Sequence, residues 1–234
     1  MGPELQAVSR TEPLPGQDIA LRQHRVLRNT YWLLAITMVP TVIGSLFGVT
    51  SNFSFLAQHP IAGPLVMFAV MMGIMFGVAA LRNTVWGIVL LLAFTFIAGW
   101  WLGPMLQYAL HMRNGAQLIG IAAGGTGAIF FALAAFATVT RRDFSFLGNF
   151  LFVGLILLVL ASIGNLFFQL PALTLGLSAI AILLFSGYIL FDISRIIHGG
   201  ETNYVMATLA LYLDIYNIFV NLLNLLLAVS GQRD

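Results

Sequence analysis

Seven long apolar segments account for most of this chain and leave it few ways to fold. They are Tyr31–Thr50, Ile61–Leu81, Val85–Gly103, Ala116–Val139, Phe146–Phe168, Leu173–Ile193 and Val205–Val229. Each is close to the roughly 20 residues that an α-helix needs to cross a bilayer. Hydrophobic residues make up 60% of the sequence and charged residues 8%, whereas soluble domains carry about 25% charged residues. The sequence therefore predicts an all-α polytopic membrane protein with seven transmembrane helices.

The arginines indicate which side of the membrane each loop faces. With a cytoplasmic N-terminus, two of the ten arginines lie outside, Arg113 and Arg233. The other eight lie inside: Arg10, Arg22, Arg25, Arg28, Arg82, Arg141, Arg142 and Arg195. Cytoplasmic loops of membrane proteins carry an excess of basic residues, so we expect the N-terminus inside and the C-terminus outside.

The chain before the first span is expected to form no domain of its own. Residues 1–18 contain three prolines, two glycines and scattered polar groups, a composition typical of a flexible tail. Residues 19–30 carry arginines at a spacing of three, which predicts a short juxtamembrane helix on anionic headgroups. Residues 1–29 are thus predicted to be a cytosolic tail with a basic juxtamembrane segment, and residues 30–234 the seven-helix domain.

Small residues recur along the fourth apolar segment. Gly120, Gly124 and Gly127 produce repeated small-xxx-small spacings, which allow helices in membranes to approach closely. We therefore expect this segment to pack tightly against its neighbours. A phosphate-binding loop is not predicted at Gly124–Gly127, because the glycines lie in mid-span and no lysine follows them.

Two aspartates lie in the last apolar hairpin, Asp192 and Asp214. A charged side chain at the centre of a membrane helix costs at least about 2.5–3.5 kcal/mol, and such residues usually face the bundle interior and have a function. Asp214 lies about ten residues into its helix, whereas Asp192 lies near the end of the preceding one. The two carboxyl groups can meet only if the sixth helix continues to about Ile197, or if one helix is tilted or broken.

Three asparagines extend the polar side of the last helix. Asp214, Asn217, Asn221 and Asn224 fall within an arc of about 80° at 100° per residue. Four polar side chains facing lipid would be unfavourable, so we expect this seventh helix to be central. The stripe would face other helices or a water-filled cavity, and the asparagines could alternatively serve only as contacts between helices.

Two interpretations of Asp192 remain open. Arg195, one turn after it, could form a simple interfacial ion pair with it, and Arg82 at the end of the second helix could compete for that role. Alternatively, Asp192 and Asp214 meet in a low-dielectric site, where two like charges cannot both ionise easily. The pair would then act as a proton-sensitive latch or as a weak cation site.

Three stretches of the sequence resemble the Bax inhibitor-1 (transmembrane Bax inhibitor motif) family. They are Arg141–Gly148, Phe191–Tyr204 and Ala210–Phe219. Within the family, the chain is most similar to the bacterial branch that modulates the FtsH protease, and this similarity is carried by Val26–Tyr31 and His198–Tyr204. The resemblance covers about residues 24–229 and implies seven helices with the seventh in the middle. For the family at large it implies a pH-sensitive calcium leak closed by an aspartate pair, at the positions of Asp192 and Asp214.

For the FtsH-modulator branch the resemblance implies an inner-membrane protein that binds this membrane-bound AAA+ protease and its associated complex. The expected partners are therefore FtsH and the lipid bilayer, and a net charge of only +2 gives no reason to expect nucleic acid. No acidic residue lies between Asp18 and Asp143, so an acidic site on the second helix, present in some leak members, is absent.

Catalytic residues and a metal centre are not predicted. The motif of intramembrane aspartyl proteases, Gly-x-Gly-Asp, does not match Leu211–Asp214, and Ser178 and His198 are expected at opposite faces of the membrane. The chain has no cysteine, and its four histidines fall in different loops or ends. We therefore expect a non-enzymatic protein without cofactors, in which calcium binds weakly at most because two carboxylates supply few of its six to eight oxygen ligands.

Overall fold

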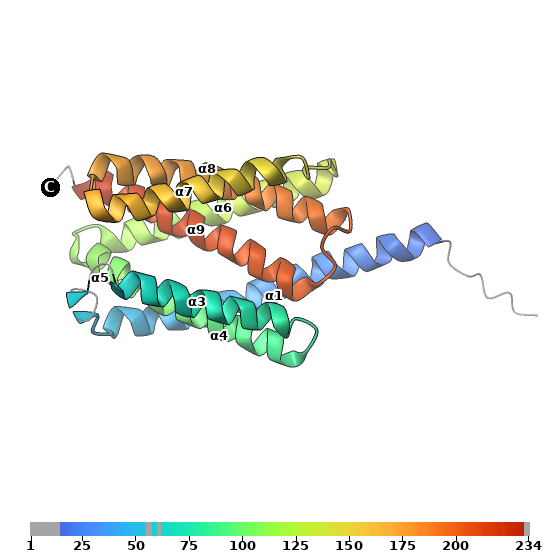
Figure 1. The fold of residues 1–234 in the computed structure, drawn as a ribbon, viewed down its shortest axis with the longest axis horizontal. Coiled ribbons are helices and arrows are strands. Elements are labelled where there is room, and N and C mark those ends of the chain that lie inside the picture. The colour runs from blue at the N-terminus through green and yellow to red at the C-terminus, as the bar shows by residue number, and fades with distance from the viewer. Residues whose placement is uncertain (1–14, 55–57, 60–61, 232–234) are drawn as a thin grey trace, which may run out of the picture.

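The computed structural model describes residues 15–54, 58–59 and 62–231, and these residues form a bundle of long helices (Figure 1). The helices are α1 (Pro15–Thr50), α3 (Ala62–Ala80), α4 (Val85–Trp101), α5 (Gly103–His111), α6 (Gly115–Thr140), α7 (Leu147–Phe168), α8 (Pro171–Ile197) and α9 (Tyr204–Gly231). Helices α4 and α5 together form the third span, so seven segments are long and apolar enough to cross a membrane. The predicted fold class is confirmed.

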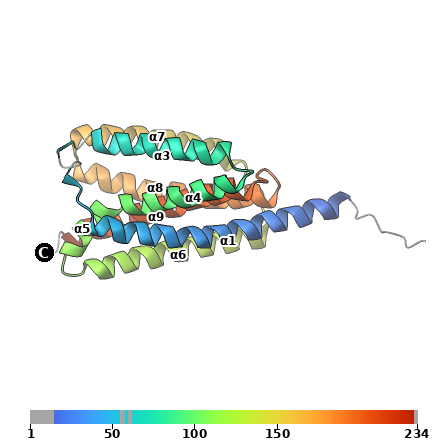
Figure 2. The same ribbon diagram turned by 90° about the horizontal axis from the view of Figure 1, so that it is seen from below.

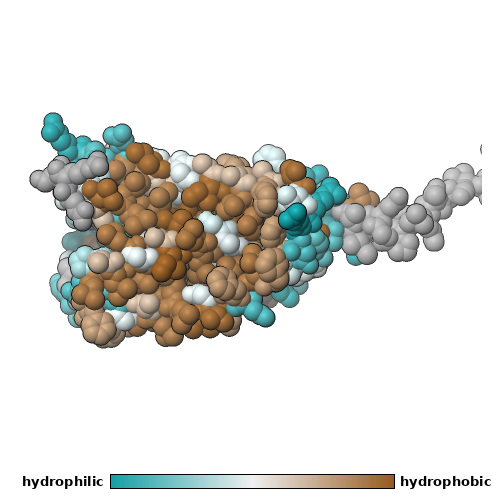
Figure 3. Space-filling view, turned by 90° about the horizontal axis from the view of Figure 1, so that it is seen from above, coloured by the Kyte–Doolittle hydropathy of each residue, from teal (hydrophilic) through white to brown (hydrophobic). Residues whose placement is uncertain are grey.

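The outer surface of the bundle is apolar over most of its length. Trp32, Phe131, Phe150 and Leu183 are each more than two-thirds exposed. In the space-filling view, hydrophobic side chains cover the middle of the molecule and hydrophilic ones gather at its two ends (Figure 3). Soluble monomers rarely expose a continuous apolar surface beyond a few hundred Å², so this belt is the surface that contacts lipid.

Helix α9 occupies the centre of the bundle, as expected. It packs against α1, α3, α4, α6 and α8. Its buried residues, among them Leu211, Tyr212 and Ile218, lie on several sides of the helix rather than on one stripe. Figures 1 and 2 show α3 and α7 on one side of α9, and α1 and α6 on the other.

The N-terminal segment differs from the expectation. Residues 19–30 are not a separate juxtamembrane helix, because α1 runs without interruption from Pro15 to Thr50. The first turns of α1 project beyond the other helices (Figure 2), and Arg22, Arg25 and Arg28 are exposed on them. Of the predicted flexible tail, residues 1–14 lie outside the described residues.

The closest helix packing is between α1 and α4, and not along α6. A Cβ atom at Gly44 or Gly48 of α1, or at Gly99 of α4, would come closer than 3.0 Å to backbone atoms of the other helix. In contrast, a Cβ atom at Gly120, Gly124 or Gly127 would meet nothing within 4 Å. The expectation of tight packing at these three glycines of α6 was therefore wrong: the spacing permits close approach, but no helix of the described residues lies against them.

This difference between glycines predicts opposite effects of the same substitution. Gly99→Ala places its methyl group against the backbone of Thr41 and is expected to destabilise the bundle by about 1–3 kcal/mol. Gly124→Ala is the control, because alanine meets no neighbour there and favours a helix by up to about 1 kcal/mol over glycine. Unfolding of the purified protein in detergent measures both, and a Gly99→Ala protein as stable as wild type would contradict the packing.

Candidate functional site

The two membrane aspartates lie on adjacent helices. Helix α8 continues to Ile197, which meets the condition for Asp192 to approach Asp214, and α8 packs along α9. Both side chains are inside the protein, because Asp192 is 8% exposed and Asp214 is 4% exposed. Each acid therefore faces protein rather than lipid.

The structure brings the two carboxyl groups together. Asp192 and Asp214 interact electrostatically and are close enough for a hydrogen bond between their side chains. Ionised carboxylates only accept hydrogen bonds, so a bond between the two requires a proton on one of them. The pair can therefore exist in two arrangements, one that shares a proton and one in which two like charges oppose each other.

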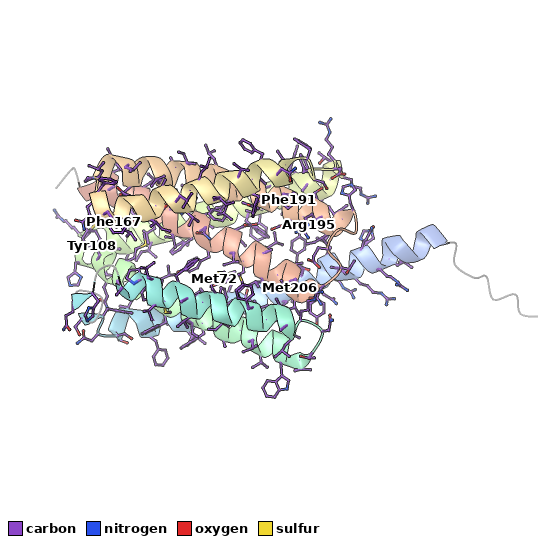
Figure 4. All side chains as sticks on the ribbon, viewed as in Figure 1. Met72, Tyr108, Phe167, Phe191, Arg195 and Met206 are labelled. Carbon is purple, nitrogen blue, oxygen red and sulfur yellow. The ribbon has the colours of Figure 1, made fainter. Side chains whose placement is uncertain are left out.

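Asp192 also has a cationic neighbour, whereas Asp214 has none among the described residues. An Arg195 nitrogen (Nη1) lies 3.7 Å from Oδ1 of Asp192, and another (Nη2) lies 3.8 Å from Oε2 of Glu201. The Arg195 guanidinium is also 5.5 Å from the centroid of the Phe191 ring, which supplies a cation–π contact (Figure 4). The Oδ2 atom of Asp214 is buried with no hydrogen-bond donor in the described part of the chain. Asp192 thus lies beside both the arginine and the second acid.

Arg82 lies at the same end of the bundle but not at the pair. Its side chain is exposed, and it forms no ion pair within the described residues. Its backbone carbonyl instead accepts a hydrogen bond of 3.1 Å from Nδ2 of Asn203, which also donates to Oδ1 of Asn83 at 2.8 Å. This contact fixes the α8–α9 loop to the α3–α4 loop.

The asparagine stripe is half-buried and largely satisfied by its own helix. The Asn217 side-chain amide donates to the Leu213 carbonyl, and that of Asn221 donates to the Asn217 carbonyl, each at 2.8 Å. Asn224 is half-buried one turn further along. One N–H of the Asn217 amide and one of the Asn221 amide are therefore bonded within α9.

The opposite side of α9 carries a hydroxyl network that sequence reasoning missed. The Tyr212 hydroxyl lies 3.0 Å from the Thr41 hydroxyl and donates to the Thr95 carbonyl at 3.3 Å, which connects α9 to both α1 and α4. The Tyr216 hydroxyl donates to the Ala98 carbonyl at 3.1 Å. The available signal was the pair of tyrosines one turn apart, because a buried tyrosine hydroxyl normally has a partner.

Ser194 is a second residue that the sequence did not single out. Its hydroxyl accepts a hydrogen bond of 2.9 Å from the Phe144 backbone N–H and donates to the Arg142 carbonyl at 3.3 Å. Ser194 therefore holds the α6–α7 loop against the end of α8, next to the acid pair. No group of three histidine, aspartate or glutamate side chains suited to a metal ion occurs among the described residues.

Comparison with known proteins places this architecture in a family. The family described as "Inhibitor of apoptosis-promoting Bax1" matches residues 23–231. The chain belongs to the Bax inhibitor-1 family. It is 43% identical over 206 residues to the Escherichia coli K12 protein named "Modulator of FtsH protease YccA". The matched region covers 88% of this chain and 91% of the relative.

Two further relatives agree on the membrane. A protein of Escherichia coli O6:H1 named "Inner membrane protein YccA" shows the same 43% identity and coverage. An "Uncharacterized membrane protein" of Vibrio cholerae is 41% identical over 207 residues, which is 88% of this chain and 90% of the relative. Together with seven apolar helices, these matches identify a multi-pass protein of the bacterial inner membrane.

The hydroxyl network predicts that Tyr212 stabilises the central helix. Tyr212→Phe removes the hydroxyl that contacts Thr41 and the Thr95 carbonyl, and we expect a loss of about 0.5–1.5 kcal/mol in unfolding free energy. Tyr108→Phe is the matched control, because Tyr108 is 63% exposed. Equal stabilities of the two variants in detergent would contradict the role of the network.

Proposed function

We propose that this protein is a non-enzymatic modulator of the membrane-bound AAA+ protease FtsH. The observation that carries the proposal is the 43% identity, over 88% of this chain, to the Escherichia coli protein of that name. A nearly full-length match of this kind leaves no large segment of the relative without a counterpart. The proposed partners are the protease with its associated complex, and the lipid bilayer.

The arginines support an orientation in which the protease can reach α1. Within the described residues, Arg113 follows α5 at one end of the bundle. The other end carries Arg22, Arg25, Arg28, Arg82, Arg141, Arg142 and Arg195. We call this the basic end, and by the positive-inside rule we assign it to the cytoplasm. The start of α1 projects from the basic end (Figure 2), and exposed chain termini are where proteases engage.

An enzymatic role is not supported by the polar groups of the spans. Ser178 and His198 lie on and just after α8, separated by 20 residues and so by about 30 Å at 1.5 Å per residue. A nucleophile and its base must come within hydrogen-bond reach. Of the two aspartates, Asp192 is engaged by the Arg195 guanidinium.

Deletion of residues 1–20 tests the proposed handle. This segment is the proposed handle for the protease, so the truncated protein is expected to survive severalfold longer in cells while still slowing degradation of membrane substrates. Pulse–chase measurements of the half-life of the truncated protein and of the half-life of a membrane substrate of the protease check this. Deletion of residues 232–234 at the opposite end is the control, and unchanged turnover after the N-terminal deletion would argue against the handle.

A second candidate function is a pH-sensitive calcium or cation leak gated by Asp192 and Asp214. It is supported by the burial of both acids, 8% and 4% exposed, and by their direct interaction. Loss of a shared proton would set two like charges against each other between α8 and α9, and this repulsion would favour separation of the helices and weak cation binding. The asparagine stripe, Asn217, Asn221 and Asn224, would offer amide oxygens along the same helix.

Asp214→Asn tests this latch in liposomes. An asparagine cannot ionise, so calcium flux is expected to change and to lose most of its dependence on pH. Asp143→Asn is the control: hydrogen bonds from the Ser145 side chain and backbone N–H lower the pKa of the exposed Asp143, so this acid is a fixed charge at the same end across neutral pH. A pH dependence that survives in Asp214→Asn would eliminate the latch.

A further inference from the structure

A long cavity of about 950 Å³ lies on the side of α9 opposite the asparagine stripe. Its walls come from α1, including Tyr31 and Met38, and from α6, including Phe130 and Ala134; Ile215 and Phe219 of α9 form its floor. Helices α1 and α6 each pack against α9 but not extensively against each other. The cavity is therefore a groove between two spans, and we call it the α1–α6 groove.

The groove is open toward the surrounding membrane. On the α6 side, Gly127 lines it, and a Cβ atom there would meet nothing within 4 Å. On the α1 side, Val42, which also lines the groove, is 58% exposed. Lipid therefore has direct lateral access to the groove.

The dimensions of the groove fit an acyl chain. Its α1 wall runs from Tyr31 to Ser45, about 21 Å at 1.5 Å per residue. A volume of about 950 Å³ along that length leaves room for a slender hydrocarbon chain.

One mouth of the groove lies at the basic end. Arg28 precedes Tyr31 by one turn on a similar side of α1, and Arg141 and Arg142 directly follow α6 beyond the groove residue Thr138. All three arginines are exposed, and in the described part of the chain none has an ion-pair partner. Asp143 is the acidic neighbour, so the mouth keeps an excess of positive charge.

Arg141 also adopts an unusual backbone conformation. Its φ of 48° and ψ of 25° are left-handed, a region that glycine or asparagine occupies more readily than arginine. An arginine at this helix end therefore adopts a backbone conformation that its residue type disfavours.

We propose that the α1–α6 groove is a binding site for one anionic phospholipid of the membrane. One acyl chain lies in the groove against α9, and the phosphate lies at the basic end, where Arg28, Arg141 and Arg142 bind it. Basic pockets between spans are a recognised mode of anionic headgroup binding. The bound chain fills the space between α1 and α6 and so supports the face of α9 that carries Tyr212 and Tyr216, both of which line the groove. This proposal does not depend on either proposed function.

The test is native mass spectrometry of the purified full-length protein with added phosphatidylglycerol or phosphatidylcholine of identical acyl chains. One phosphatidylglycerol per chain is expected, in preference to phosphatidylcholine. The double variant Arg28→Gln/Arg141→Gln should weaken phosphatidylglycerol binding about 25-fold, from about fivefold for each arginine near the headgroup. Arg22→Gln is the matched control, because nine residues before Tyr31 place Arg22 on the opposite side of α1.

A bulky side chain placed in the α1–α6 groove tests separately whether an acyl chain binds there. Gly127→Phe should abolish retention of either lipid, whereas Gly164→Phe on α7, an equally half-buried glycine whose Cβ also meets nothing within 4 Å, should leave binding unchanged. Equal binding of the two lipids, or full retention by both the arginine and the Gly127 variants, would overturn the proposal. So would a dimer that Gly127→Phe dissociates, because a second copy of the chain would then occupy the groove.

Discussion

The architecture depends on keeping the polar side chains of α9 out of lipid. Asp214 is buried at 4% exposure, and the hydroxyl groups of Tyr212 and Tyr216 donate to backbone carbonyls on α4. Hydrocarbon offers no hydrogen bonds, so a helix with polar groups on two sides is stable only when other spans surround it. The central position of α9 among α1, α3, α4, α6 and α8 meets this requirement.

The two sides of α9 have different chemistry. One side carries Asp214 and the half-buried asparagines toward the hairpin with α8. The other carries the tyrosines, which bind α1 and α4 through their hydroxyls and line the α1–α6 groove with their rings. The two proposed sites, the α1–α6 groove and the acid pair, thus lie on opposite sides of the same helix.

The contacts around the acid pair concentrate at the basic end. Arg195 contacts both Asp192 and Glu201, Ser194 holds the α6–α7 loop, and Asn203 holds the α3–α4 loop. Two loops are thus tied to the end of α8 and to the turn between α8 and α9. Any separation of these helices would have to break or stretch these contacts, which provides a physical link between the buried pair and the surface at the same end.

The sequence by itself determined the seven spans and the central position of α9, because long apolar runs and a polar stripe at helical spacing constrain any chain in a bilayer. It also identified Asp192 and Asp214, since carboxyl groups inside apolar segments are conspicuous. Only the tertiary structure decided which glycines are in contact: Gly44 and Gly99 meet another backbone, while Gly120 and Gly124, with equally suitable spacing, meet none. The spacing of small residues shows that a second helix could approach a helix face closely. Whether a helix does lie against that face depends on the packing of the whole bundle. For the same reason the Tyr212–Thr41 contact and the α1–α6 groove, which join residues far apart in the sequence, required the folded structure.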